Sequence, residues 1–441
     1  MNSLLSNSLS NIFNKWQEYK DVIINLTTQD LNSSINVHGL KGSLNSYFIA
    51  DYCNTKKNKT LQSFQYNAAG YSSQTLKSKN NNIFSNGCEN LLVVVPTERD
   101  ADIVASDINA FFPDIEVSIL PGWGTVPYKS LPIGSITFGK RAGVFAKMLT
   151  QKNQVFIVTQ RVFQTPVPEP DYIKSLIFSL KVGNTIDTVQ IAQKLSSCGY
   201  TRVPKVSVRG EFSLKGEVLD IFLPQEPFPY RIVFDFDTIE NIKSFDIDTQ
   251  KTSEVVSGIT VYPMKEILWD KQMVEKLNGI FDNYIEDSKK NDKSIESVCL
   301  PFSEQAIQFK DNLILNLFEK GESEGEEVFY PLLWNKKYTV LDYLDESCTV
   351  IYYDYDKLEN AQESLDREFI GMYRKTRLEL PIFSPVLFLT SLTALTTSCF
   401  SSNVACEKLI RATFIPAYTI FSITSGLQLA GPILHIIFVF F

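Results

Sequence analysis

Apolar runs separated by polar stretches predict alternating strands and helices in the first half of the chain. Leu91–Val95 is a continuous aliphatic run that ends at a proline, which is typical of a buried parallel strand. A helix is predicted from about Asp100 to Phe112, followed by strands at Val117–Leu120 and Val155–Thr159. This alternation predicts an α/β fold, in which a parallel sheet has helices on both faces.

A different pattern occupies residues 188–236. A helix-like stretch, Thr188–Cys198, ends at a glycine that suits a helix C-cap. An extended segment then turns at Lys215-Gly216 into a second one, Val218–Phe222, and an alternating strand follows at Tyr230–Phe236. A helix, a hairpin and a further strand predict a small α+β domain inserted into the first one.

The strand from Tyr230 to Phe236 has two chemically different faces. Because alternate residues of a strand share a face, one set is expected to pack on the helix and the other to point outward. The inward set is Tyr230, Ile232 and Phe234, and the outward set is Arg231, Val233 and Asp235, with Lys215 of the hairpin nearby. Taken alone, this pattern is typical of an ordinary solvated sheet face.

The rest of the chain is predicted to return to the first domain. Helices are expected near residues 264–290 and 301–319, and a strand at Thr349–Tyr353. Residues 53–89 are rich in lysine, asparagine, serine and glutamine and predict a mobile surface insertion. A group of acidic residues is interpreted as a solvated loop: Glu322, Glu324, Glu326 and Glu327.

The final stretch departs from this composition. From Leu380 to Phe441 the charged residues are Glu407, Lys408 and Arg411 alone. A translation frame lost near residue 390 is the favoured interpretation. A membrane anchor at Phe421–Phe441 has the right length but contains polar residues and a proline, and an ordinary buried core segment is the third possibility.

Composition limits the chemistry. The chain has 441 residues, 44% of them hydrophobic and 21% charged, as folded globular proteins have. A net charge of −8 argues against an electropositive DNA-binding face over the whole chain. Seven cysteines without a CxxC pair and two histidines argue against a zinc site and against most catalytic triads. The start shows no signal peptide, and a cytoplasmic location is expected.

Two glycine-rich stretches resemble phosphate loops without completing the motif. Around Gly39, Gly42 and Ser43 the lysine precedes the second glycine, whereas a working loop needs glycine, lysine and then serine or threonine. We expect this loop to be inactive, although a helix N-terminus there can still attract an anion. The second stretch runs from Gly134 to Arg141, where an arginine stands in place of the magnesium ligand.

The acidic pair Asp345-Glu346 resembles a magnesium-binding end of a strand, but without a phosphate-binding lysine it has no nucleotide to serve. From its residues we therefore assign this chain no catalytic group, no metal and no cofactor.

The run from Gly199 to Thr252 carries a family resemblance. Its GEF, KG, LDIF and PYR segments resemble the UvrB-like module of bacterial transcription-repair coupling factors. The resemblance covers about residues 31–389 and is specific over 91–97, 121–141 and 198–252. It implies a degenerate helicase-like domain interrupted by a domain that docks the damage sensor UvrA.

The same resemblance implies functions for individual residues. Arg231 matches an arginine that contacts UvrA. Lys215 stands where the family usually has arginine, and Asp235 stands where an aromatic side chain is common. Phe234 and Phe236 are candidates to replace that aromatic contact.

One segment separates two related families. UvrB-like proteins carry a long tyrosine-rich hairpin after the position of Tyr128, whereas here about a dozen residues lead to Arg141, with Phe138 as their aromatic residue. The chain therefore looks like a coupling factor rather than UvrB.

The resemblance implies that the full-length protein uses ATP and magnesium in a DNA translocase that removes stalled RNA polymerase. Its polymerase-binding and motor domains lie further toward the C-terminus and are expected to be missing here. The rival hypotheses are a complete ATP-dependent translocase or a UvrB-like protein acting on damaged DNA, and a membrane-tethered binding protein. The predicted organisation is a helical lead-in at 1–30, a UvrB-like domain at 31–174 and 264–378 with its insertion at 53–89, a UvrA-binding α+β domain at 175–263, and an aberrant apolar tail at 390–441.

Overall fold

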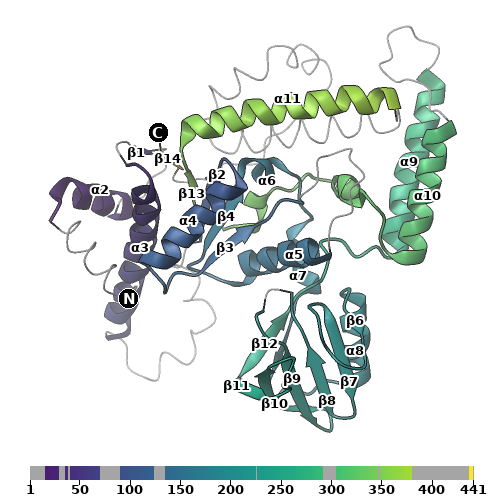
Figure 1. Ribbon diagram of the computed structural model, residues 1–441, viewed down its shortest axis with the longest axis horizontal. Helices are drawn as coiled ribbons and strands as arrows, with labels where there is room; N and C mark the ends of the chain where they lie inside the picture. Colours follow the sequence, from purple (N-terminus) through teal and green to yellow (C-terminus); the bar gives the residue numbers. More distant parts are fainter. Residues whose placement is uncertain are drawn as a thin grey trace.

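A parallel sheet covered by helices and a smaller domain rich in antiparallel strands make up the fold (Figure 1). This architecture confirms the predicted fold class. The computed structural model describes residues 15–28, 35–37, 40–69, 90–123, 135–224, 226–291, 304–345, 348–379 and 437–440.

The parallel sheet has the strand order β1-β14-β13-β2-β4-β3. Its strands are β1 (Ile35–Val37), β2 (Leu91–Val95), β3 (Val117–Leu120), β4 (Val155–Thr159), β13 (Thr349–Tyr352) and β14 (Ile437–Phe440). The strands predicted at residues 91–95, 117–120 and 155–159 are confirmed as β2, β3 and β4.

Both faces of strand β2 are buried, which explains its continuous apolar run. All five of its residues are buried, but alternate ones enter different cores. Leu92 and Val94 pack with helix α5, whereas Leu91, Val93 and Val95 pack with helices α3 and α4 on the other face. The helices of this domain are α2 (Gln17–Thr28), α3 (Ser43–Ala69), α4 (Glu98–Phe111), α5 (Ser135–Thr150), α6 (Gln160–Gln164), α7 (Pro170–Leu176) and α11 (Tyr355–Glu379).

Helix α4 begins two residues earlier than the sequence predicts. The Thr97 side chain accepts a hydrogen bond from the backbone N–H of Asp100 at 3.2 Å, which satisfies a donor that a helix start leaves unpaired. Glu98 and Asp100 in the first turn also suit the positive end of the helix dipole.

Helix α3 corrects the predicted insertion. It continues to Ala69 through residues that were expected to form a mobile loop from Cys53 onward, and Cys53 itself is buried. The prediction is therefore wrong for residues 53–69, because these polar residues continue helix α3 and do not form a loop. Residues 70–89 lie outside the described part of the chain.

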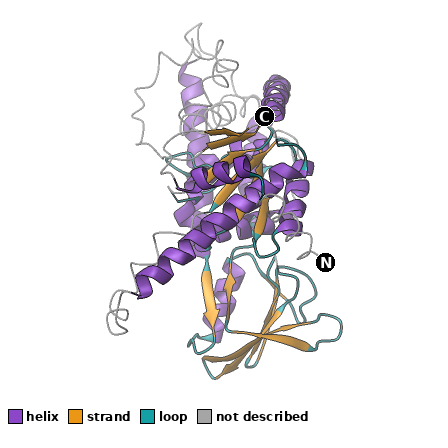
Figure 2. Ribbon diagram, turned by 90° about the vertical axis from the view of Figure 1, so that its left-hand side faces the viewer, coloured by secondary structure: helices purple, strands orange, loops and turns teal. Residues whose placement is uncertain are grey.

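The smaller domain begins at β5 and ends at β12. Its main sheet has the order β11-β10-β9-β8-β7-β6, in which β6 and β7 are parallel and the other neighbours are antiparallel. In Figure 2 the strands of this domain lie at the bottom, apart from the parallel sheet. Helix α8 packs on one face of this sheet over a buried apolar core. The elements are β5 (Phe178–Lys181), α8 (Thr188–Ser197), β6 (Thr201–Arg202), β7 (Glu211–Lys215), β8 (Val218–Ile221), β9 (Tyr230–Asp235), β10 (Thr238–Phe245), β11 (Thr252–Val256) and β12 (Gly258–Val261).

A helical unit follows the smaller domain. Its helices share an apolar core with Ile267 and Trp269, which precede the first of them. They are α9 (Lys271–Asn291), α10 (Glu304–Lys320) and the 3-10 helix η1 (Glu326–Leu333), and a second 3-10 helix, η2 (Val340–Tyr343), leads toward β13.

The segment 262–269 connects the two domains and is fixed to both. On the side of the smaller domain, the Met264 N–H donates to the Cys198 carbonyl at 2.9 Å. Gly210, with a φ of +86°, lies so close to Met264 that an added Cβ would stand 2.5 Å from its Cε atom. On the other side, the Leu268 N–H donates to the Tyr172 hydroxyl at 2.9 Å.

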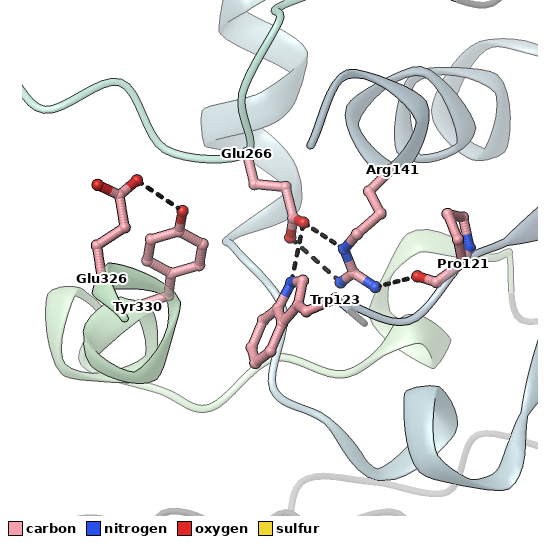
Figure 3. A network of polar contacts seen from close by, with 6 residues as sticks. All are labelled: Pro121, Trp123, Arg141, Glu266, Glu326 and Tyr330. Carbon is pink, nitrogen blue, oxygen red and sulfur yellow. Dashed lines mark hydrogen bonds and ion pairs between the residues drawn. The ribbon is translucent and has the colours of Figure 1, made fainter. Parts of the chain in front are cut away.

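A buried ion pair completes this connection (Figure 3). Arg141 of α5 and Glu266 of the connecting segment are 1% and 0% exposed, and the guanidinium engages both carboxylate oxygens. Its Nη1 atom donates to the Pro121 carbonyl at 2.6 Å, and Trp123 Nε1 donates to Glu266 at 3.1 Å. The guanidinium also faces the rings of Trp123 and Phe145, at 5.2 and 5.5 Å from their centroids. Arg141 therefore has a structural function here.

The predicted solvated acidic loop is only half correct. Glu322 and Glu324 are largely exposed, but Glu326 and Glu327 are buried at the start of η1. The prediction is wrong for this second pair, because η1 folds back onto the helical unit and encloses them.

Glu326 is buried with two hydrogen-bond donors. Its carboxylate accepts from the Ser323 N–H at 2.7 Å and from the Tyr330 hydroxyl at 3.1 Å. Burial raises the pKa of Glu326 above the usual value, and these hydrogen bonds offset only part of that effect.

Four residues of the apolar tail belong to the parallel sheet. Strand β14 pairs with β1 on one side and with β13 on the other. Residues 380–436 lie outside the described part of the chain, and the three interpretations of the tail stay predictions. Among the described helices, none has the length and apolar character needed to span a bilayer.

Replacing Arg141 by alanine is expected to destabilise the protein by about 3–5 kcal/mol, because the Glu266 carboxylate would remain buried without its partner. Lys147→Ala is the matched control, since it removes a more exposed ion pair of the same helix, to Glu116 at 2.8 Å, and should cost less than about 1 kcal/mol. Urea denaturation measures both values. Equal losses in the two variants would contradict the importance of the buried pair.

The raised pKa of Glu326 predicts a pH dependence of stability. The folded state binds this proton more tightly than the unfolded chain, so the contribution to stability is present below the ordinary glutamate pKa and is lost as pH rises through the raised one. Glu326→Gln does not titrate and should therefore become more stable relative to wild type as pH rises from about 4 to about 8. Urea midpoints along this series test the prediction, with the exposed Glu324→Gln as control. A difference that falls with rising pH would contradict it.

Candidate partner-binding face

One face of the β6–β11 sheet is turned away from helix α8 and carries Arg231 and Lys215, two of the predicted contact residues. Strand register places Arg231 of β9 directly opposite Asp220 of β8 and Lys243 of β10. Asp220 in turn lies opposite Ser213, and Lys243 opposite Val255. We call this side of the sheet, with Lys215 and Val233, the outer face.

Lys215 lies on the same face as Arg231. It is two residues beyond Ser213 along β7, and its partner Val218 is paired with Val233 of β9. Its side chain is exposed at the end of the β7–β8 hairpin. The expectation that Lys215 and Arg231 share one surface therefore agrees with the register.

Arg231 is held in place by its own chain. Its Nε and Nη2 atoms donate to the two carboxylate oxygens of Asp220 at 2.7 and 2.8 Å, and Nη2 also donates to Gln250 at 3.1 Å. The guanidinium lies 4.6 Å from the ring centroid of Phe245. Arg231 therefore makes its bidentate contact with Asp220 of the same domain, and sequence reasoning missed this pairing. The sequence feature that could have revealed it is a pair of opposite charges on neighbouring strands.

This arrangement leaves part of the guanidinium available. Nη1 makes no hydrogen bond within the described part of the chain, and the Arg231 side chain is 26% exposed. A guanidinium fixed by Asp220 loses little conformational entropy when a partner carboxylate approaches it. Lys243, which sequence reasoning also missed, adds a second cation beside it.

The other predicted contact residues separate into buried and exposed positions. Phe234 is 1% exposed and belongs to the core under α8, so its assignment to the interface is wrong. Asp235 is exposed at the end of β9, opposite Thr238. Phe236, the other candidate for an aromatic contact, is 82% exposed in the turn that follows.

The predicted phosphate loop is only partly described. Gly42 has a φ of +59° and precedes α3, and Ser43 is the first residue of that helix. Gly39 lies outside the described residues. The lysine nearest to this helix start is Lys41, which is exposed.

The second phosphate-loop motif is part of a helix. Gly139, Lys140 and Arg141 lie inside α5, where their backbone N–H groups serve the helix. A Cβ on Gly139 would stand 2.9 Å from Pro224, so this glycine permits close packing against the smaller domain. Arg141 is occupied by Glu266. Asp345 pairs with Lys152, and its neighbour Glu346 lies outside the described residues.

A metal centre finds no support in the described ranges. No group of three or more histidine, cysteine, aspartate or glutamate side chains there is arranged to hold a metal ion.

Comparisons with known proteins identify the family of the smaller domain. Residues 178–267 match the family described as the UvrB interaction domain. The chain is 23% identical over 299 residues to the transcription-repair-coupling factor of Haemophilus influenzae, covering 67% of this chain and 24% of that protein. It is 25% identical over 277 residues to that of Borreliella burgdorferi, covering 62% and 22%.

A UvrB protein gives a match of similar strength. The UvrABC system protein B of Kosmotoga olearia is 27% identical over 285 residues, which cover 60% of this chain and 42% of that protein. The chain thus spans less than half the length of each of these relatives. It is a distant homologue of transcription-repair coupling factors and UvrB over the N-terminal region, and it contains a UvrB interaction domain.

Proposed function

We propose that this chain docks UvrA through the outer face of its α+β domain, as the N-terminal module of a transcription-repair coupling factor. The observation that carries the proposal is that Arg231 and Lys215 share one exposed sheet face within the segment that matches the UvrB interaction domain. A module of this kind would bring UvrA to RNA polymerase stalled at DNA damage, in the cytoplasm.

The outer face offers a partner three cations, of which Arg231 is held in one orientation. Arg231 is oriented by Asp220, while Lys215 and Lys243 lie on the same side of neighbouring strands. Acidic side chains on UvrA are the complementary chemistry, because guanidinium and ammonium groups form charge-assisted hydrogen bonds with carboxylates. The partner therefore needs no metal or nucleotide from this chain.

We propose contacts with RNA polymerase and DNA only for a longer protein. The same applies to an ATP-driven motor with magnesium. A motor needs a lysine in a complete phosphate-binding loop. In the described part of the chain, neither Lys41 nor Lys140 stands in such a loop. We propose that this chain alone hydrolyses no ATP.

The match to a UvrB protein supports a second candidate function, which is direct action on damaged DNA. It differs from the first in its partner, since DNA binding would rely on cations facing a phosphate backbone. A net charge of −8 makes this the weaker candidate.

Arg231→Ala is expected to weaken UvrA binding by about 2 kcal/mol, roughly 30-fold, because it removes the oriented cation from the centre of the outer face. Isothermal titration calorimetry of the full chain with UvrA measures the change. Lys194→Ala is the matched control, since this cation lies on helix α8, on the opposite side of the sheet, and faces the ring of Phe178. Unchanged binding by Arg231→Ala, or equal losses in both variants, would argue against this interface.

ATP hydrolysis by the full chain is expected to stay at the buffer background with and without DNA. Lys41→Ala and Lys140→Ala should behave as wild type, because neither lysine stands in a complete phosphate loop. A coupled phosphate-release assay tests this. DNA-stimulated hydrolysis that disappears in either variant would refute the proposal and favour a working motor.

A further inference from the structure

We propose that Lys56 is a nucleophilic lysine that small acyl phosphates modify on its ε-amine. The site is a cluster of side chains where helix α3 meets the start of strand β13, in the parallel-sheet domain. The proposal is independent of UvrA docking, because this cluster lies outside the domain that carries the outer face.

The Lys56 amine is enclosed by groups from two elements. Its Nζ atom donates a hydrogen bond to the Thr349 hydroxyl at 3.4 Å and lies 5.4 Å from the centroid of the Tyr52 ring. Tyr52 and Thr349 are themselves buried, and their hydroxyl groups share a hydrogen bond of 3.3 Å. The side chain of Lys56 is only partly exposed. These surroundings remove much of the water that would stabilise a positive charge on the amine.

Two thiols complete the cluster. Cys53 of α3 and Cys348, which directly precedes β13, are 8% and 1% exposed, and both lie close enough to Lys56 to act on its charge. Burial raises the pKa of Cys53 to about 11 and that of Cys348 to about 12, so both stay protonated at neutral pH. Since the thiolate is the reactive form of cysteine, neither side chain competes with the amine for an electrophile.

The same burial activates the amine. It lowers the pKa of Lys56 to about 8, an effect that exceeds the opposing influence of the two thiols. At pH 8 about half of the amine is then neutral, whereas an ordinary lysine with a pKa of about 10.4 is neutral in roughly 0.4% of molecules. Only the neutral amine has the lone pair that attacks an acyl carbon, and desolvation is a recognised way to activate a lysine nucleophile.

The neighbouring charges and the limited space indicate the class of electrophile. Lys57 lies near Cys53 and Lys152 lies near Cys348, where their positive charges lower the pKa of each thiol against the larger effect of burial. A positive potential of this kind attracts an anionic reagent. The partial burial of Lys56 favours a small one. Acyl phosphates combine both properties with a good leaving group.

The reaction is an acyl transfer. The Lys56 nitrogen forms a bond to the acyl carbon, the bond from that carbon to the phosphate oxygen breaks, and phosphate leaves with the electron pair. The nitrogen releases one proton to solvent. The product is a neutral amide, which removes the charge from the buried cluster and keeps one N–H that can donate to Thr349.

Acetylation of the full chain by acetyl phosphate tests the proposal, with mass spectrometry of fragmented peptides to follow each lysine. Lys57 is the matched control, because it is the next residue of the same helix and is likewise partly exposed. At pH 8 Lys56 should react at least about tenfold faster than Lys57, since a neutral fraction roughly a hundredfold above that of an ordinary lysine outweighs the weaker nucleophilicity of a less basic amine. The rate at Lys56 should reach half of its maximum near the pKa of about 8.

The same reaction in concentrated urea separates the effect of the fold from that of the local sequence. The advantage of Lys56 should disappear there, because the cluster depends on contacts between α3 and β13. Lys56→Arg should lose the fast reaction, since arginine stays protonated. Equal rates at Lys56 and Lys57 in the folded protein, a preference that persists in urea, or acetylation of Cys53 or Cys348 in place of Lys56 would overturn the proposal.

Discussion

Arg141 and Glu266 meet where three parts of the chain come together. These are α5, the residues that follow β3 and the segment that leaves the smaller domain. Burying an ion pair removes two charges from water, and the cost is offset only if the remaining donors and acceptors are satisfied. Here the Pro121 carbonyl and the Trp123 indole complete the hydrogen bonding. The pair fixes one side of the connecting segment, while Met264 fixes the other, so the orientation of the smaller domain depends on it.

That orientation determines which surface a partner meets. Because strand side chains alternate, one face of the smaller sheet is committed to α8 and the other is left to solvent. On the solvent side, the Asp220–Arg231 pair orients a guanidinium, and the turn after β9 holds an exposed ring. The same domain thus combines a conventional apolar core with a surface that carries an oriented guanidinium and an exposed aromatic ring.

Much of this could be predicted from the sequence. Leu91–Val95 was recognisable because five consecutive aliphatic residues that end at a proline are typical of a strand buried on both faces. The outward position of Arg231 followed from simple alternation along β9. Alternation also placed Phe234 inward, and its assignment to the interface came from the resemblance alone, which the burial of its ring corrects.

Other features depend on contacts between distant residues. The pairing of Arg231 with Asp220 requires the register set by the β7–β8 hairpin, which a single strand pattern does not reveal. Glu326 and Glu327 look like part of a solvated acidic run until η1 folds onto the helical unit. The length of α3 was missed because its second half is polar, and polar residues are equally common in exposed helices and in loops.

Hydrogen exchange of the full chain with and without UvrA tests the central claim most directly, because it locates the interface without substituting any residue. The account predicts slower exchange on binding at residues 211–218 and 230–238, with β2 and β4 unchanged. Protection confined to the parallel-sheet domain or to α9 and α10, with none in β9 and its turn, would contradict it.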